Sequence, residues 1–98
     1  ALSGSGPAYV FHMVEAMAAA GVELGLAPDL AMKLARATVA GSGELLQQSP
    51  EDAATLRINV TSPGGTTAAA LALLMPEMPP LFTRALAAAA ARSRELAG

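Results

Sequence analysis

The chain has 98 residues, of which 53% are hydrophobic, 14% charged and 3% aromatic, and its formal net charge is −2. This length fits one domain, and the absence of a basic stripe argues against a nucleic-acid-binding surface. There is no Cys and one His, which excludes a disulfide framework and argues against a metal site. The uncharged run at residues 58–76 contains Asn, Pro and Gly, which a membrane span of about 20 apolar residues rarely tolerates. We therefore expect a cytoplasmic protein.

The first predicted helix covers residues 7–24 and follows a loop rich in Gly and Ser. Pro7 suits the first helical position, and Ser5 lies close enough to cap it. Gly25 suits the left-handed residue that ends many helices. One narrow stripe carries the polar residues, which are His12, Glu15 and Glu23. The rest of this helix is apolar, and His12 is interpreted as a solvated residue of the polar stripe.

The second predicted helix covers residues 28–48, with Asp29 in its first turn, where the helix dipole favours an anion. Its polar residues again form one stripe: Asp29, Lys33, Arg36, Glu44 and Gln47. Gly41 and Gly43 lie inside the helix, and each costs about 1 kcal/mol relative to Ala. We expect close packing against another backbone as the reason for these two glycines.

Three more helices are predicted. A short one has Ser49 as its cap and a proline at its first position, and it ends near residue 57 or 58. Another covers residues 66–75 and ends at Pro76. The last covers residues 79–96, opened by a pair of prolines. No strand-like alternation of useful length occurs, so the sequence predicts an all-α bundle of about five helices.

The first two helices are apolar around most of their circumference, and such helices are normally buried on nearly all sides. A monomer of 98 residues offers too little interior to bury them. We therefore predict a homodimer with interleaved long helices, which sedimentation at micromolar concentration would detect as a species of twice the chain mass.

The sequence NVTSPGGTT at residues 59–67 interrupts this helical pattern. Gly64 and Gly65 allow positive φ and close approach of a ligand. The next residues open a helix, whose free N–H groups suit a phosphate or carboxylate. Hydroxyl groups are contributed by Ser62, Thr66 and Thr67. A type II turn capped by Ser or Thr explains the same residues, so both interpretations stay open at this point.

A second glycine-rich stretch, Gly4-Ser5-Gly6, matches the first half of a dinucleotide-binding fingerprint. The third glycine is missing because Tyr9 occupies its position, and no strand precedes the stretch. A structured loop before a helix is the simpler interpretation.

The VTSPGGTT segment at residues 60–67 resembles the signature of Δ1-pyrroline-5-carboxylate reductases, and other segments agree. These are residues 2–9, with LSGSGPAY; Glu15 and Ala16; residues 21–26; Leu56; Ala70, Leu71 and Leu74; and residues 92–96. The resemblance covers essentially the whole chain. Met75 departs from it, because the family often has a polar or acidic residue there.

The resemblance implies the second half of a two-domain enzyme. In that family an N-terminal Rossmann domain binds NADPH or NADH, and a C-terminal helical domain dimerises and holds the substrate. Residues 1–98 look like the helical domain alone, so the isolated chain is predicted to be inactive. The full-length parent is expected to reduce the cyclic imine 1-pyrroline-5-carboxylate to L-proline, the last step of proline biosynthesis. A higher oligomer of dimers is compatible with the resemblance.

The resemblance also implies roles for residues of the 59–67 segment. Thr67 is the substrate-contacting and catalytic threonine, near the imine nitrogen, as a proton donor or relay. Thr66 occupies a position that varies within the family, although its backbone N–H can still bind the substrate. The residues implied to surround the substrate carboxylate are Ser62, Gly64 and Gly65. Asn59 and Val60 are implied to lie near the cofactor, and no metal is required.

Two alternatives remain. The chain could be a non-catalytic helical dimerisation module in which the segment at residues 59–67 is only a turn. In that case Thr67→Ala in the full-length protein leaves turnover intact. It could instead be the helical domain of another NAD(P)-dependent imine or hydroxyacid reductase, in which case the same loop binds a different acid.

Overall fold

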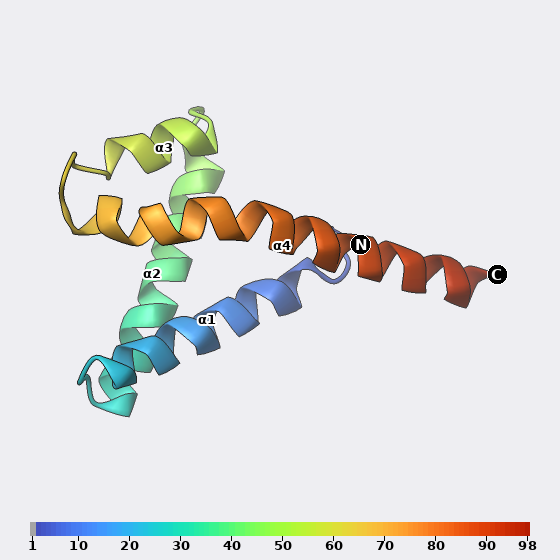
Figure 1. Ribbon diagram of the computed structural model, residues 1–98, viewed down its shortest axis with the longest axis horizontal. Coiled ribbons are helices and arrows are strands. Elements are labelled where there is room, and N and C mark those ends of the chain that lie inside the picture. The colour runs from blue at the N-terminus through green and yellow to red at the C-terminus, as the bar shows by residue number, and fades with distance from the viewer. Residues whose placement is uncertain (1) are drawn as a thin grey trace. The chain divides into compact units, whose positions relative to one another are not determined.

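The computed structural model describes residues 2–98, so that Ala1, the first residue of the expected domain, lies outside the described part. The described residues form helices and no strand, which confirms the all-α class (Figure 1). The helices are α1 Gly6–Glu23, α2 Pro28–Gln48, α3 Ala53–Asn59 and α4 Thr66–Ala97. The chain divides into two compact units, one of residues 3–50 with α1 and α2, the other chiefly of residues 51–98 with α3 and α4.

The turn between α1 and α2 has the geometry that its glycine predicts. Gly25 has a φ of 106°, and the N–H of Leu26 donates to the carbonyl of Gly21 at 3.0 Å. Such a left-handed residue satisfies carbonyls that the end of a helix leaves unpaired. At the other end of α1, Ser5 is the N-cap residue, but its hydroxyl makes no capping bond. It is hydrogen-bonded to the Tyr9 hydroxyl instead.

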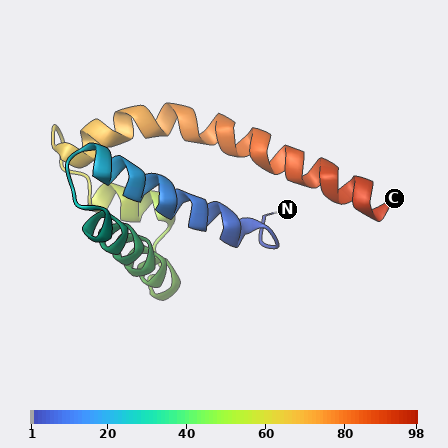
Figure 2. The same ribbon diagram turned by 90° about the horizontal axis from the view of Figure 1, so that it is seen from below.

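The core of the α1–α2 unit is built from alanines. Ala18, Ala31 and Ala35 are buried, and Val14 packs against them. A Cβ on Gly21 would lie 3.2 Å from the Cβ of Ala31, so the absence of a side chain at Gly21 lets the two helices approach (Figures 1 and 2). This small-residue contact explains how α1 and α2 pack without large side chains between them.

Large apolar side chains remain on the surface of both units. Phe11 on α1 is 67% exposed and Leu73 on α4 is 71% exposed. A Cβ at Gly41 or Gly43 would meet nothing within 4 Å, so the close packing expected at these glycines is absent within this chain. The exposed apolar surface is what the sequence pattern predicts for helices that bury their sides against a partner.

The α3 helix begins later than the sequence predicts. Ser49 ends α2, and Asp52 is the N-cap of α3, where its Oδ1 accepts a hydrogen bond of 2.8 Å from the N–H of Thr55. A carboxylate is as good a cap as a Ser hydroxyl. The predicted start of α3 at Ser49 and Pro50 was therefore wrong, and Asp52 is the residue that caps the helix. Hydrogen bonds from the Thr55 side chain and backbone lower the pKa of Asp52.

This cap predicts a pH dependence for α3. Because the pKa of Asp52 is lowered on folding, its contribution to stability is present above the unfolded pKa and is lost as the pH falls through the folded pKa. We expect the Thr55 amide signal to move towards its unfolded position as the pH falls below the ordinary pKa of an Asp carboxyl, about 3.9. The variant Asp52→Asn keeps an acceptor without a titrating group, so its Thr55 signal should not follow pH. An identical titration in both proteins would contradict the assignment.

A single helix, α4, occupies the region where two were predicted. Pro76, Pro79 and Pro80 all lie inside it, so the expected end at Pro76 was wrong, and so was the count of five helices. Proline has a helical φ, and inside a helix it removes one hydrogen bond and bends the axis without having to end it. Figure 2 shows α4 as one continuous and gently curved helix. The Thr83 hydroxyl donates to the carbonyl of Pro79 at 3.0 Å and supports this region.

Candidate functional site at the start of α4

The loop between α3 and α4 is a tight turn. Gly64 has a φ of 72°, and the N–H of Gly65 donates to the carbonyl of Ser62 at 3.0 Å. With Pro63 at the second position and Gly64 at the third, these features are those of a type II turn. The turn geometry that the sequence predicts is therefore confirmed, and Gly64 is required for its left-handed conformation.

The second glycine has a different role. Gly65 is the N-cap of α4 with an extended backbone. A Cβ at this position would lie 3.2 Å from the carbonyl oxygen of Ser62, which is tighter than side chains normally tolerate. Gly65 therefore lets the turn close tightly onto Ser62, its first residue.

The first N–H groups of α4 have no internal partner. Because the N-cap is a glycine, no side chain caps the helix, and its first turn carries no acidic residue. The first intrahelical bond joins the N–H of Ala69 to the carbonyl of Gly65 at 3.1 Å. Among residues 2–98, the backbone N–H groups of Thr66, Thr67 and Ala68 make no hydrogen bond. The capping by Ser or Thr that the turn-only interpretation expects is not observed.

This arrangement can bind an anion. Unpaired N–H groups at a helix N-terminus point at the same region of space, and the helix dipole adds partial positive charge there. Ser62, Thr66 and Thr67 bring hydroxyl groups to the same end of α4, and no hydrogen bond within the described residues engages them. A carboxylate could accept several hydrogen bonds at this position without a competing negative charge.

The predicted site residues occupy two places. The turn and the first turn of α4 hold Ser62, Gly64, Gly65, Thr66 and Thr67. Thr67 is half-buried, whereas Thr66 is exposed. Asn59 is the last residue of α3, and its side-chain amide donates to Oε2 of Glu51 at 3.2 Å. Val60 follows as the C-cap residue of α3 and is 66% exposed. The two residues implied for the cofactor thus lie at the α3 end of the loop.

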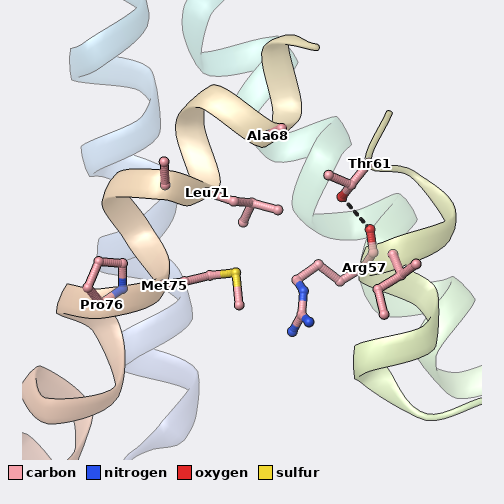
Figure 3. A pocket seen from close by; sticks show the side chains of 8 residues that line it. Arg57, Thr61, Ala68, Leu71, Met75 and Pro76 are labelled. Atoms are coloured by element: carbon pink, nitrogen blue, oxygen red, sulfur yellow. Dashed lines mark hydrogen bonds between the residues drawn. The ribbon is translucent and has the colours of Figure 1, made fainter. Parts of the chain in front are cut away.

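Two residues that the sequence analysis did not single out lie next to this turn. The hydroxyl of Thr61 donates to the carbonyl of Arg57 at 2.5 Å (Figure 3). Both residues line a groove of about 540 Å³ in the α3–α4 unit, together with Ile58, Ala68, Leu71, Ala72, Met75 and Pro76. The Arg57 and Met75 side chains point toward each other across this groove (Figure 3). Thr61 lies four residues after Arg57, and this spacing is the sequence signal for a hydrogen bond from a threonine hydroxyl to a helical carbonyl.

Other candidate features have simpler roles in the structure. The His12 side chain is 82% exposed and lies 3.1 Å from Oε1 of Glu15, as its place on the polar stripe predicts. Within residues 2–98, no group of three or more His, Cys, Asp or Glu side chains could hold a metal ion. In the same part of the chain, no helix combines the length and the apolarity that are needed to cross a membrane.

Comparisons with known proteins agree on one family. A family model described as pyrroline-5-carboxylate reductase dimerisation matches residues 1–96. The chain is 45% identical over 96 residues to a pyrroline-5-carboxylate reductase from Arabidopsis thaliana, covering 97% of this chain and 35% of that protein. It is 52% identical over 73 residues to a reductase of the same name from Synechocystis, covering 74% of this chain and 27% of that protein.

A solved structure is also similar. It is the crystal structure of Plasmodium falciparum pyrroline carboxylate reductase with NADP bound, which aligns with a TM-score of 0.90 and 35% identity. The alignment covers 99% of this chain and 37% of that one. The chain thus spans about a third of the length of the relatives that it matches.

Proposed function

This chain belongs to the pyrroline-5-carboxylate reductase dimerisation family, and from that premise we propose that it is the dimerisation and substrate-binding domain of such a reductase. The full-length parent reduces 1-pyrroline-5-carboxylate to L-proline with NADPH or NADH. A Rossmann domain that precedes residues 1–98 in that parent supplies most of the cofactor site. The share of the relatives that the chain covers, 35% of the Arabidopsis protein and 37% of the Plasmodium one, supports a longer parent. The order of the two domains is what the resemblance implies.

The observation that carries the proposal is the uncapped N-terminus of α4. Its first N–H groups are unpaired within the described residues, and its N-cap is a glycine rather than a capping side chain. A buried or half-buried donor that is left without a partner costs free energy, so a fold that keeps these donors open gains stability when an anion binds. The substrate carries such an anion in its carboxylate.

The residues of the loop take complementary roles toward this substrate. The carboxylate accepts hydrogen bonds from the N–H groups of Thr66, Thr67 and Ala68, with Ser62 as a further donor. Gly64 and Gly65 keep side chains away from the bound carboxylate. With the carboxylate anchored, the half-buried hydroxyl of Thr67 is placed to reach the ring nitrogen and to donate or relay a proton. Catalysis then rests mainly on orientation of the ring for hydride transfer.

The nicotinamide cofactor supplies the hydride when it is bound. The described residues contain no glycine-rich turn between a strand and a helix, which is the element that binds the pyrophosphate in a Rossmann fold. Asn59 and Val60 are proposed to contact the cofactor from the α3 end of the loop, and the exposure of Val60 leaves its side chain accessible.

The homodimer forms through the exposed apolar surfaces of the long helices, where Phe11 and Leu73 are each more than half exposed in the single chain. Burial of such side chains contributes about 1.5–3 kcal/mol each. A dimer therefore supplies the interior that one copy lacks. Assembly of dimers into a higher oligomer is compatible with this arrangement.

Activity and assembly can be tested together. We expect the 98-residue chain alone to sediment as a dimer and to show no oxidation of NADPH in the presence of pyrroline-5-carboxylate. The full-length parent should oxidise NADPH with this substrate. Oxidation by the isolated chain would contradict the division of roles between domains. A full-length parent that is inactive with pyrroline-5-carboxylate but active with another imine or hydroxyacid would favour the alternative reductase.

A further inference from the structure

Thr61 joins the end of α3 to the proposed carboxylate site. Its hydroxyl donates to the carbonyl of Arg57 at 2.5 Å, and its backbone N–H donates to the carbonyl of Ile58 at 3.0 Å. Two separate donors of one residue thus bind two successive carbonyls of the last helical turn. This fixes the position of Thr61 relative to α3.

The Thr61 hydroxyl makes the shorter of two hydrogen bonds to the Arg57 carbonyl at the end of α3. The Arg57 carbonyl also accepts from the N–H of Val60, but that distance is 3.3 Å, which is long for a backbone hydrogen bond. The helix has no left-handed residue at this end, because Thr61 follows the C-cap Val60 and positive φ among the described residues occurs only at Gly25 and Gly64. A helix of 7 residues is too short to be stable on its own, so its end depends on contacts such as this one.

The turn follows directly from Thr61 along the chain. Ser62 is the next residue, and its carbonyl accepts the N–H of Gly65, which is the N-cap of α4. We propose that Thr61 is a positioning residue, which holds the Ser62–Gly65 turn and hence the open N–H groups of α4 in the geometry that binds the substrate carboxylate. This inference rests on the proposed function, because it assigns the support of the same site.

The expected effect is on substrate affinity rather than on the chemical step. Without the hydroxyl bond, the turn populates other positions, and the substrate binds only the fraction with the competent geometry. The KM for pyrroline-5-carboxylate therefore rises by the inverse of that fraction. Once the substrate is bound, the turn is held in place, so kcat changes little.

Two variants of the full-length reductase separate the hydroxyl from packing. Thr61→Val keeps the shape of the side chain that lines the groove and loses the donor, whereas Thr61→Ser keeps the donor and loses a methyl group. We expect Thr61→Val to raise the KM for pyrroline-5-carboxylate about three- to tenfold, the range that the net contribution of one hydrogen bond allows. The kcat and the KM for NADPH should stay within about twofold, and Thr61→Ser should behave like the wild type.

Amide hydrogen exchange of Gly65 gives a second readout that does not depend on activity. Thr61→Val should speed exchange of this amide, which bonds to Ser62 in the turn, and Thr61→Ser should not. Equal KM and exchange rates in all three proteins would overturn the proposal, as would equal effects of both substitutions or a loss confined to kcat. If the wild type does not reduce pyrroline-5-carboxylate, the proposed function fails, and the exchange data still decide whether Thr61 holds the turn.

Discussion

Thr67→Val in the full-length reductase should lower kcat/KM for pyrroline-5-carboxylate by about 10- to 100-fold, which corresponds to a loss of about 1.4–2.7 kcal/mol of transition-state stabilisation. Valine has nearly the same shape as threonine and leaves the backbone N–H in place. The substitution therefore removes only the hydroxyl that is proposed to reach the ring nitrogen. Thr67 is half-buried at the first turn of α4.

The matched control is Thr66→Val, one residue earlier on the same helix turn. The Thr66 side chain is exposed, and its N–H is also retained in the valine variant. We expect kcat/KM within about threefold of the wild type for this control, as for a surface substitution away from the reacting atoms. Equal losses in the two variants would point to a general disturbance of the helix start. Full activity of Thr67→Val would favour the alternative that the segment at residues 59–67 is only a turn.

The second large effect is expected on the dimer. Phe11→Glu should raise the dissociation constant of the dimer by more than about 100-fold. Burial of one phenylalanine contributes about 1.5–3 kcal/mol, and the substitution occurs in both copies. Phe11 is 67% exposed in the single chain. It lines a mostly apolar groove together with Val10, Val14, Glu15, Met32, Arg36, Val39 and Ala40. Sedimentation velocity over a concentration series measures the dissociation constant.

The control for this experiment is His12→Glu, which introduces the same carboxylate one residue along α1. The His12 side chain is 82% exposed and lies on the polar stripe with Glu15, so its replacement should leave the dimer intact. Circular dichroism of both variants confirms that they keep their helices. A dimer that tolerates Phe11→Glu would show that this face of α1 is not part of the interface.

Much of the fold follows from local signals in the sequence. The positions of α1 and α2 and the turn at Gly25 follow from apolar periodicity and from glycine chemistry. The type II turn at residues 62–65 follows in the same way, because Pro-Gly at its centre permits few other conformations. These features depend on neighbours in the chain, which the sequence displays directly.

The predicted helix boundaries were wrong where two local sequence signals for a helix start or end compete. At the start of α3, Ser49 and Asp52 are both good caps, and the structure uses Asp52, whose Oδ1 accepts from the N–H of Thr55. In α4, the sequence predicts a helix end at Pro76, whereas the structure continues the helix through this residue and tolerates the lost hydrogen bond. Local propensity is a weak guide in both cases.

Some features of the candidate site could likewise be predicted from the sequence, and others could not. The two glycines and the hydroxyl groups of Ser62, Thr66 and Thr67 could be identified from sequence, whereas the absence of a side-chain cap on α4 could not. The sequence analysis does not identify the support of the turn by Thr61, because the spacing of four residues from Arg57 is a weak signal until the end of α3 is known. The wider site stays a prediction, since it includes a cofactor domain that is proposed to precede residues 1–98.

The central claim is that the open N–H groups of α4 bind the substrate carboxylate, and amide NMR of the full-length dimer tests it most directly. Titration with L-proline, which carries the ring and the carboxylate, should shift the amide signals of Thr66, Thr67 and Ala68 saturably. Pyrrolidine, which has the ring without the carboxylate, should leave these three signals in place. Saturable proline binding that leaves them unmoved, or equal shifts with pyrrolidine, would contradict the account.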